Sequence, residues 1–306
     1  MAPNRKRLRG AALVVASGIL WGFSGTCGQL LSQNCGVPVE WVTFQRLFWS
    51  ALFFLVVGLL FDRKNIFALL SNRKDVVHLV VYAVFGMIGC MWFYLEVIAW
   101  TNAGTGTLME QLGLILVLAC TCLMEHRGPK ALEVLGLVMA FVGIFLVCTH
   151  GDPHTLVFAP QGLLWGIAAC FGVAFYIMLP VPLLKNHGSL TVTAPAFVIA
   201  AAAGALIFHP WTYHVEVTGM VAFGTAGMVI CGTILAYLLF MQGEKDAGPM
   251  LAGLLNTIEL VAAFVISHFW LGTEISIWDI AGAACIISMM IMITVKDPAA
   301  VAKPKH

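Results

Sequence analysis

The sequence predicts an all-α polytopic membrane protein with ten transmembrane helices, built as two inverted five-helix repeats with both termini in the cytoplasm. The chain is 60% hydrophobic and 10% charged, whereas a soluble protein has about 25% charged residues. Apolar runs of about 20 residues, long enough to cross a bilayer, recur from end to end. A repeated motif indicates the two halves, and the distribution of Lys and Arg indicates the orientation.

An internal repeat divides the chain into two halves. Residues 18–28, GILWGFSGTCG, return at residues 162–172 as GLLWGIAACFG, an offset of 144 positions. The Gly-x-x-x-Gly spacing in each copy lets another backbone approach closely, within a monomer or across a dimer. We therefore expect a first repeat over residues 1–150, a second over residues 151–297 and a cytoplasmic tail over residues 298–306.

Ten apolar runs are the candidate spans, and the connectors between them are too short for a soluble domain. Their approximate ranges are 10–31, 39–61, 76–98, 103–124, 131–150, 162–182, 191–209, 218–241, 247–270 and 276–295. The first run is too long for the apolar core of a signal peptide and lacks an A-x-A cleavage site, so we expect a retained span. Residues 62–75 form the longest inner connector, where IFALL predicts a short interfacial helix.

Positive charge indicates the orientation of these spans. With the N-terminus inside, inner segments hold 15 of the 16 Lys and Arg residues, and the outer connectors hold none. They are Arg5, Lys6, Arg7, Arg9, Arg63, Lys64, Arg73, Lys74, Arg127, Lys130, Lys185, Lys245, Lys296, Lys303 and Lys305. Such an excess is typical of cytoplasmic connectors. Because five spans per half is an odd number, the second half enters the membrane upside down, a plan typical of secondary transporters.

Several function classes find no support in the sequence. The net charge of +1 provides no basic field for nucleic acid. The nine cysteines form no C-x-x-C pair, and we expect no cofactor and no metal. We find no H-E-x-x-H, G-x-S-x-G, P-loop or dinucleotide-binding motif, so we do not expect an enzyme.

Longer motifs recur in a fixed order along the chain. They are LWG at 20–22 and 164–166, RLFWSALFF at 46–54, FYLEVIAWTNAGTGTLMEQLGLILV at 93–117 with its counterpart at 236–265, Glu125 and Glu274 before the last helix of each half, and WDIAGAACIISMMIMI in the last helix. In order and spacing, these motifs resemble the EamA family of the drug/metabolite transporter superfamily, the ten-helix bacterial exporters.

The resemblance implies export of amino acids, amines or small metabolites through a central cavity. It also implies that the first, third and fourth spans, with their partners the sixth, eighth and ninth, line this cavity. Many family members carry a proline in the middle of the fourth and ninth helices. Here Leu260 follows Glu259 and no proline lies between Gly104 and Arg127, so this chain lacks the residue that would break the two helices.

Ionisable side chains within the spans are the first candidate binding residues, because a charge inside a membrane is costly. Glu259 lies about 12 residues into the ninth span, with no Lys or Arg predicted nearby. Its carboxyl group would suit a proton-coupled step or the binding of a substrate ammonium. The structural alternative is a protonated Glu259 that hydrogen-bonds to Asn256 or Thr257.

Arg46 and Glu110 lie at similar depths in the second and fourth spans, and we expect an ion pair between them. Such a pair either locks two helices together or opens to hold a zwitterion, with Arg46 on the carboxylate and Glu110 on the amine. Gln111 and Asn256 fall in corresponding parts of the two halves and would add neutral hydrogen bonds.

Four aromatic side chains complete the candidate site. Trp21 and Trp165 lie mid-span rather than at the lipid interface, where Trp usually concentrates. Tyr94 and Tyr237 are repeat partners in the third and eighth spans. On glycine-rich faces such rings would stack on apolar or cationic substrates, and helix packing is an equal alternative for each Trp.

We therefore expect an inner-membrane secondary transporter that exports amino acids or related small metabolites by alternating access, either proton-driven or as a passive uniport. Its partners would be a small-molecule substrate and the lipid bilayer, in a monomer or homodimer. The nearest alternative among transporters is a carrier of sugar phosphates or nucleotide sugars. Binding of such a dianion would require several Lys or Arg within the spans, where only Arg46 lies. A membrane-embedded enzyme or scaffold is the alternative from a different class.

Overall fold

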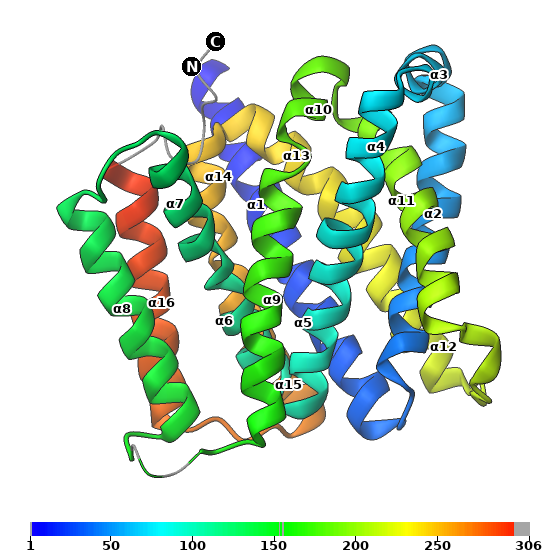
Figure 1. Cartoon of the computed structure of the whole chain (residues 1–306). Coiled ribbons are helices and arrows are strands. Elements are labelled where there is room, and N and C mark those ends of the chain that lie inside the picture. Colours follow the sequence, from blue (N-terminus) through cyan, green and yellow to red (C-terminus); the bar gives the residue numbers. More distant parts are fainter. Residues whose placement is uncertain (1, 153, 155, 297–306) are drawn as a thin grey trace.

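The computed structural model describes residues 2–152, 154 and 156–296, and every regular element in those residues is a helix. The expected tail over residues 298–306 lies outside the described residues. Nine helical segments of the described chain are long and apolar enough to cross a bilayer, and the apolar stretch Ile277–Met292 is a shorter tenth. An all-α polytopic fold with nine to ten spanning helices is therefore confirmed (Figure 1).

Five spans make up the first half of the chain. In order they are α1 (Ala2–Gln29) with the π-helical turn η1 (Leu30–Asn34); α2 (Val39–Phe61); α4 (Arg73–Val81), η2 (Tyr82–Ile88) and α5 (Gly89–Trp100) as one span; α6 (Ala103–Gln111) and α7 (Gly113–Met124) as another; and α8 (Ala131–Thr149). The short helix α3 (Arg63–Ser71) follows α2 and contains the predicted IFALL segment.

The second half repeats this order. Its elements are α9 (Pro160–Met178) and α10 (Val181–His187); α11 (Ser189–Phe208) and the turn η3 (Pro210–Thr212); α12 (Gly219–Ala226), η4 (Gly227–Leu235) and α13 (Ala236–Ala247); α14 (Pro249–Asn256) and α15 (Ile258–Leu271); and α16 (Ile277–Lys296). In Figure 1, α1 begins at the upper end, α9 begins at the lower end and α16 returns to the upper end. The two halves therefore cross the molecule in opposite directions.

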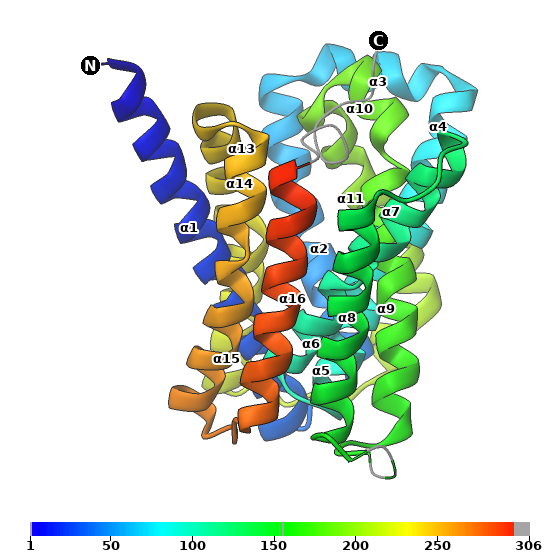
Figure 2. The same ribbon diagram turned by 90° about the vertical axis from the view of Figure 1, so that its left-hand side faces the viewer.

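The helices pack so that two outer pairs flank a central group. α2 packs against α11 and α8 packs against α16, and these pairs lie on opposite sides of the other spans (Figures 1 and 2). In the centre, α1 contacts α13 and α15, and α5 contacts α9, so each half packs on the other. Large apolar side chains such as Leu123, Leu206 and Phe269 are exposed on the outer surface, where a bilayer would cover them.

Two glycines of the repeated motif allow helix backbones to touch. A Cβ atom on Gly22 would lie 2.7 Å from the Cβ of Ala262 and from the backbone nitrogen of Ala263, both on α15. A Cβ atom on Gly172 would lie 2.8 Å from the carbonyl carbon of Gly89 on α5. No real side chain tolerates such distances, so these glycines serve helix contacts within the chain.

The fourth and ninth spans are both broken, although neither contains a proline at the break. The Leu112 amide donates to the Met109 carbonyl at 3.1 Å, and the Ile115 amide donates to the Leu112 carbonyl at 2.9 Å. In the ninth span the Thr257 amide donates to the Leu254 carbonyl at 3.4 Å, and the Leu260 amide donates to the Thr257 carbonyl at 3.2 Å. The Thr257 hydroxyl also donates to the Leu254 carbonyl at 2.8 Å. Bonds between residues three apart tighten one turn and separate α6 from α7 and α14 from α15.

Candidate binding cavity

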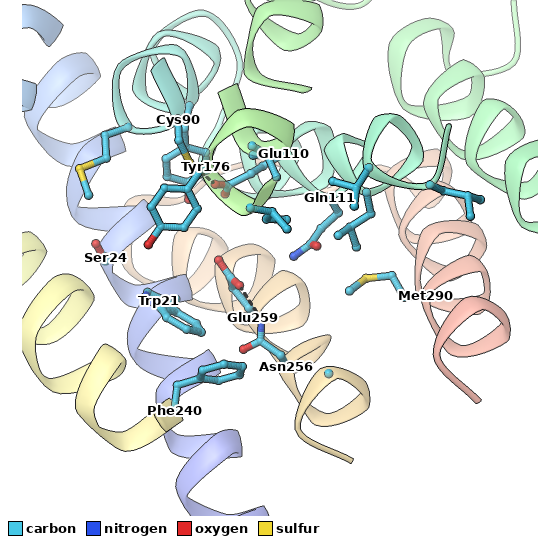
Figure 3. Close-up of a pocket in the computed structure, with 18 of the residues that line it drawn as sticks. Trp21, Ser24, Cys90, Glu110, Gln111, Tyr176, Phe240, Asn256, Glu259 and Met290 are labelled. Atoms are coloured by element: carbon cyan, nitrogen blue, oxygen red, sulfur yellow. Dashed lines mark hydrogen bonds between the residues drawn. The ribbon is translucent and has the colours of Figure 1, made fainter. Parts of the chain in front are cut away.

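A cavity of about 470 Å³ lies among the central spans, within the size range of small-molecule sites. Of the predicted site residues, it is lined by Trp21, Arg46, Tyr94, Glu110, Gln111, Asn256 and Glu259. Glu110 and Gln111 end α6 and Asn256 ends α14, directly before the two breaks, while Glu259 lies in the first turn of α15. The breaks therefore bring polar side chains from both halves to one place (Figure 3).

The cavity extends from the breaks toward the end of the molecule at which α1 begins. Along the fourth span its wall runs from Glu110 to Thr121, close to the last residue of α7, Met124. Gly253 midway along α14 and Met290 toward the end of α16 also line the cavity. These helix ends lie on the upper side of Figure 1, as does the start of α1.

Hydrogen bonds tie the opposite end of the molecule together. The Gln29 side chain accepts a bond from the Ala103 amide at 2.8 Å and donates one to Thr273 Oγ1 at 2.9 Å. The Gln33 side chain donates to the Thr101 carbonyl at 2.9 Å. We call these five residues the latch, because they fasten the end of the first span to the turn before α6 and to the connector after α15.

Glu259 and Asn256 face each other across the break in the ninth span. Glu259 is buried and accepts a hydrogen bond from Asn256 Nδ2 at 3.3 Å (Figure 3). Asn256 Oδ1 is also buried, and it has no hydrogen-bond partner in the part of the chain that the structure describes. A buried acceptor without a donor costs about 1–3 kcal/mol, so this oxygen is available to a ligand that brings an N–H or O–H group.

The expected ion pair between Arg46 and Glu110 is not formed among the described residues, and that prediction is wrong. Arg46 Nε donates instead to Thr233 Oγ1 at 3.0 Å, and Glu110 Oε1 accepts a hydrogen bond from the Cys90 thiol at 3.5 Å. The reason is the π-helical segment η4, which the sequence did not reveal. Within it the Thr233 hydroxyl donates to the carbonyl of Met228, five residues earlier, at 3.3 Å, which leaves the oxygen lone pairs free to accept from Arg46.

Tyr237 does not line the main cavity, whereas its repeat partner Tyr94 does. It lines a smaller space of about 60 Å³ that shares Trp21 and Arg46 with the main cavity, and its hydroxyl bonds to Ser189 Oγ at 2.8 Å. The two tyrosines differ because the π-helical segment η4 has nine residues and η2 has seven. A longer π-helical segment turns the residues that follow it, so repeat-related side chains point to different places.

Trp165 also lies outside the cavity, while its repeat partner Trp21 lines it. The Trp21 ring lies 5.3 Å from that of Phe240, which is also in the cavity wall. The Trp165 ring instead packs against Trp92 and Phe93, with centroids 5.5 and 5.7 Å away. The two repeats have different neighbours, since α1 packs on α13 and α15 while α9 packs on α5. Trp165 thus takes the helix-packing role.

The comparison with known families bears directly on this fold. The EamA-like transporter family matches residues 8–149 and residues 160–295, once in each half. The chain belongs to this family. The resemblance drawn from the sequence motifs is therefore confirmed, and it assigns the protein to the transporters rather than to the enzymes.

Curated relatives agree with this assignment. The uncharacterized inner membrane transporter YicL of Salmonella typhimurium is 29% identical over 290 residues, which cover 94% of this chain and 95% of YicL. The uncharacterized transporter YyaM of Bacillus subtilis is 25% identical over 227 residues, covering 70% of this chain and 72% of YyaM. A solved crystal structure superposes with a TM-score of 0.63 and 17% identity over 93% of this chain and 96% of its own, which shows the fold alone. Family and spans together define a multi-pass membrane protein.

Several side chains in the cavity of this EamA-like protein were not identified from the sequence. Ser24, Cys90, Tyr176 and Phe240 line it and are labelled in Figure 3. Ser24 had a usable signal, because it follows Trp21 by three residues and so shares its helix face. The other three lie in apolar runs without such a marker. Which face of a buried helix meets a cavity depends on its neighbours in space.

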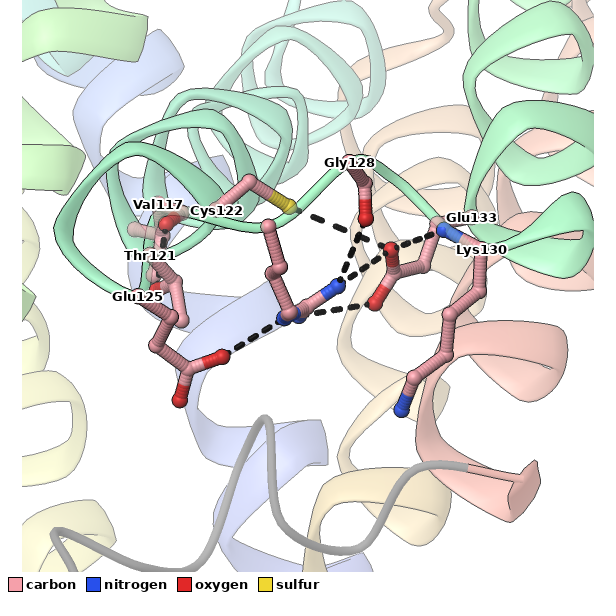
Figure 4. Close-up of polar contacts among 8 residues, drawn as sticks. Val117, Thr121, Cys122, Glu125, Gly128, Lys130 and Glu133 are labelled. Carbon is pink, nitrogen blue, oxygen red and sulfur yellow. Dashed lines mark hydrogen bonds and ion pairs between the residues drawn. The ribbon is translucent and has the colours of Figure 1, made fainter.

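The turn between α7 and α8 holds an ion-pair network near the end of the cavity wall (Figure 4). Arg127 donates two bonds to Glu133, at 2.9 and 3.0 Å, and a third to Glu125 at 2.6 Å. Glu133 also accepts the Lys130 amide at 2.7 Å, which caps α8. Glu133 first, and then Glu125, raise the pKa of the Arg127 guanidinium above its ordinary value. The sequence motifs singled out Glu125, but the buried carboxylate that pairs with Arg127 is Glu133.

Proposed function

We propose that this chain is an inner-membrane secondary transporter that exports amino acids or related small metabolites by alternating access. The observation that carries the proposal is the central cavity, which both halves line at the two helix breaks. Broken spans of this kind form the substrate sites of many secondary transporters, because irregular backbone is tolerated in a membrane where it lines a cavity. The description of YicL as an inner membrane transporter supports the location.

The distribution of positive charge supports a cytoplasmic opening. Arg63 and Arg127 lie in connectors, and Lys74 in the first turn of α4, at the end of the molecule where α1 begins. The positive-inside rule assigns such an end to the cytoplasm. The cavity extends toward the same end, while the latch ties the other end. In this arrangement the cavity would take up its substrate from the cytoplasm, which is the first step of export.

The charges of the cavity favour a zwitterion or an amine over an anion. Its charged lining consists of the Arg46 guanidinium and the carboxyl groups of Glu110 and Glu259. A sugar phosphate or nucleotide sugar would bring two negative charges to a site with a single Arg and two carboxyl groups. An amino acid would place its carboxylate at Arg46 and its ammonium at a carboxyl group, and apolar residues such as Leu114 would accept its side chain.

Glu259 is the residue that we propose for proton coupling. It is buried in the ninth span beside a cavity, and its described protein partner is a neutral amide. A proton and a substrate ammonium would occupy this carboxyl group in turn, because each of them neutralises the same charge. Binding of one would release the other, so the two would move in opposite directions across the membrane.

Counterflow in proteoliposomes tests the proposed function. Vesicles are loaded with one unlabelled class each, amino acids, amines, nucleosides or sugar phosphates, and uptake of the labelled counterpart is measured. We expect exchange of amino acids, and we expect Glu110→Gln to slow it about tenfold, since it removes a charge-assisted contact. The matched control is Glu216→Gln on an exposed connector, which should exchange like the unmodified protein. Exchange of sugar phosphates alone, or of no class by folded protein, would contradict the proposal.

A further inference from the structure

The unpaired oxygen of Asn256 is the starting observation. Asn256 Oδ1 is buried in the wall of the cavity without a donor among the described residues. The N–H side of the same amide is engaged with Glu259 Oε2 at 3.3 Å. In Figure 3 the Asn256 amide lies between the Glu259 carboxyl group and the Phe240 ring. A bound molecule that reaches this position must therefore donate a hydrogen bond rather than accept one.

Asn256 and Glu259 bring hydrogen-bond acceptors together in the cavity wall. The two oxygens of the Glu259 carboxyl group can hold several hydrogen bonds, and the described protein supplies one, from Asn256. The donor-rich group is Arg46, whose Nε is bound to Thr233. Its other N–H groups have no hydrogen-bond partner among the side chains and backbone groups that the structure describes. Asn256 Oδ1 and the Glu259 carboxyl group thus form an acceptor pole, and Arg46 offers N–H donors to the same cavity.

Aromatic rings border the acceptor pole. Trp21 and Phe240 both line the cavity, with ring centroids 5.3 Å apart and planes inclined by 49°. Figure 3 shows the two rings beside Asn256 and Glu259. The faces of aromatic rings attract cations and not anions. The pair is held by the packing of α1 against α13, so it does not have to be assembled by the ligand.

We infer that Asn256 and Glu259 bind a free ammonium group of the substrate against these two rings. The substrate's carboxylate, where it has one, points toward Arg46. The inference rests on the proposed transport function and adds a requirement to it. An acylated amine has lost its positive charge and two of its N–H bonds, so it leaves both Asn256 Oδ1 and the carboxylate unsatisfied and should be rejected.

Three matched probes test the requirement by competition in the counterflow assay. They are L-leucine, N-acetyl-L-leucine, which lacks the ammonium, and isoamylamine, which lacks the carboxylate. All three carry the same aliphatic side chain, which suits the apolar wall around Leu114. We expect L-leucine and isoamylamine to compete, and N-acetyl-L-leucine to be at least about 100-fold weaker, because a site with unpaired polar groups discriminates strongly. Equal competition by N-acetyl-L-leucine would overturn the inference.

Two variants of one residue locate the subsite. Asn256→Leu removes the acceptor at similar volume, and we expect the half-saturating concentration of L-leucine to rise about tenfold. Asn256→Gln keeps both the oxygen acceptor and the N–H donor of the amide, and it should weaken binding less than Asn256→Leu does. Both are checked for folding by size-exclusion chromatography, so a misfolded variant is recognised. A folded Asn256→Leu protein with unchanged half-saturation would place the ammonium elsewhere and overturn the inference.

A separate readout distinguishes failure of transport from failure of the subsite. If none of the three probes exchanges, the transport proposal fails for this substrate class. Thermal unfolding of the solubilised protein with isoamylamine then reports binding directly. Stabilisation that disappears in Asn256→Leu would support the subsite without transport. No stabilisation of the unmodified protein would overturn the subsite as well.

Discussion

At the scale of single residues, the two carboxyl groups of the cavity have different hydrogen-bond partners. Glu259 accepts a bond from Asn256, its neighbour across the same helix break. Glu110 accepts a hydrogen bond from the thiol of Cys90 on α5, and a thiol is a weak donor. Replacement of either residue by glutamine keeps the shape and removes the charge. Glutamine at position 259 would therefore test proton coupling and ammonium binding together, whereas glutamine at position 110 would test substrate binding alone.

We expect Glu259→Gln to abolish uptake that is driven by an imposed pH gradient, while counterflow at equal pH continues at saturating substrate. Glutamine cannot carry the proton, but it can still pack beside Asn256. The measurement is accumulation of labelled L-leucine in vesicles with and without the gradient. Glu216→Gln, on an exposed connector, is the control. Gradient-driven uptake that survives in Glu259→Gln would remove the proton role from this residue.

Trp21 and Trp165 form a matched pair, since they are repeat partners in different surroundings. Trp21→Ala removes part of the cavity wall and should raise the half-saturating substrate concentration about tenfold, a typical loss for a desolvated contact between a cation and an aromatic ring. Trp165→Ala removes packing on Trp92 and Phe93 and should lower the free energy of unfolding by about 2–3 kcal/mol. Thermal unfolding and counterflow measure the two effects. Equal effects of both variants on the half-saturating substrate concentration would contradict the placement of Trp21 in the cavity wall and of Trp165 outside it.

At the scale of helices, close backbone contacts explain the repeated glycines. We expect Gly172→Leu to lower the stability by about 3 kcal/mol or more, because its side chain would enter the backbone of Gly89 on α5. Gly128→Leu is the control, since a Cβ there meets nothing within 4 Å. The yield of monodisperse protein and its thermal unfolding report the difference. Similar stability of the two variants would show that α5 and α9 can separate freely.

The elements also show how far the sequence could predict the site. Three charged residues within apolar runs, Arg46, Glu110 and Glu259, line the cavity. The sequence marked them because a membrane penalises charges that face lipid, and their role in binding stays a prediction. The helix breaks were not predicted, since Leu112 and Thr257 are not helix-breaking residues and the tightened turns depend on surrounding packing. The π-helical segments were equally hidden. They placed the Thr233 hydroxyl next to the Arg46 guanidinium. They also turned Tyr237 away from the main cavity, which its repeat partner Tyr94 lines.

At the scale of the whole molecule, the proposed alternating-access cycle requires the latch to open so that the cavity can reach the other side. Gln29→Leu removes the bonds to Ala103 and Thr273 and should favour the outward-open state about thirtyfold, given about 1 kcal/mol for each of the two bonds. In intact cells a membrane-impermeant maleimide would then label the cavity thiol Cys90 faster, as measured by peptide mass spectrometry.

A control for this experiment lies on the surface of the second span. The side chain of Gln45 accepts a hydrogen bond from Trp49 on the exposed face of α2, and Gln45→Leu should leave the labelling of Cys90 unchanged. An unaltered labelling rate in folded Gln29→Leu protein would show that the latch does not hold the outer end closed.

The charged lining of the cavity has an electrical consequence. With both carboxyl groups ionised, the one guanidinium and two carboxylates that line the cavity would give it a single negative charge. A bound zwitterion would not change this charge, whereas a proton would neutralise it. A cell interior that is negative would push the charged, loaded cavity outward, with about 2.3 kcal/mol available per elementary charge for each 100 mV. The protonated cavity would return without electrical work. Each cycle would then carry one positive charge inward, so that the voltage and the proton gradient drive export together.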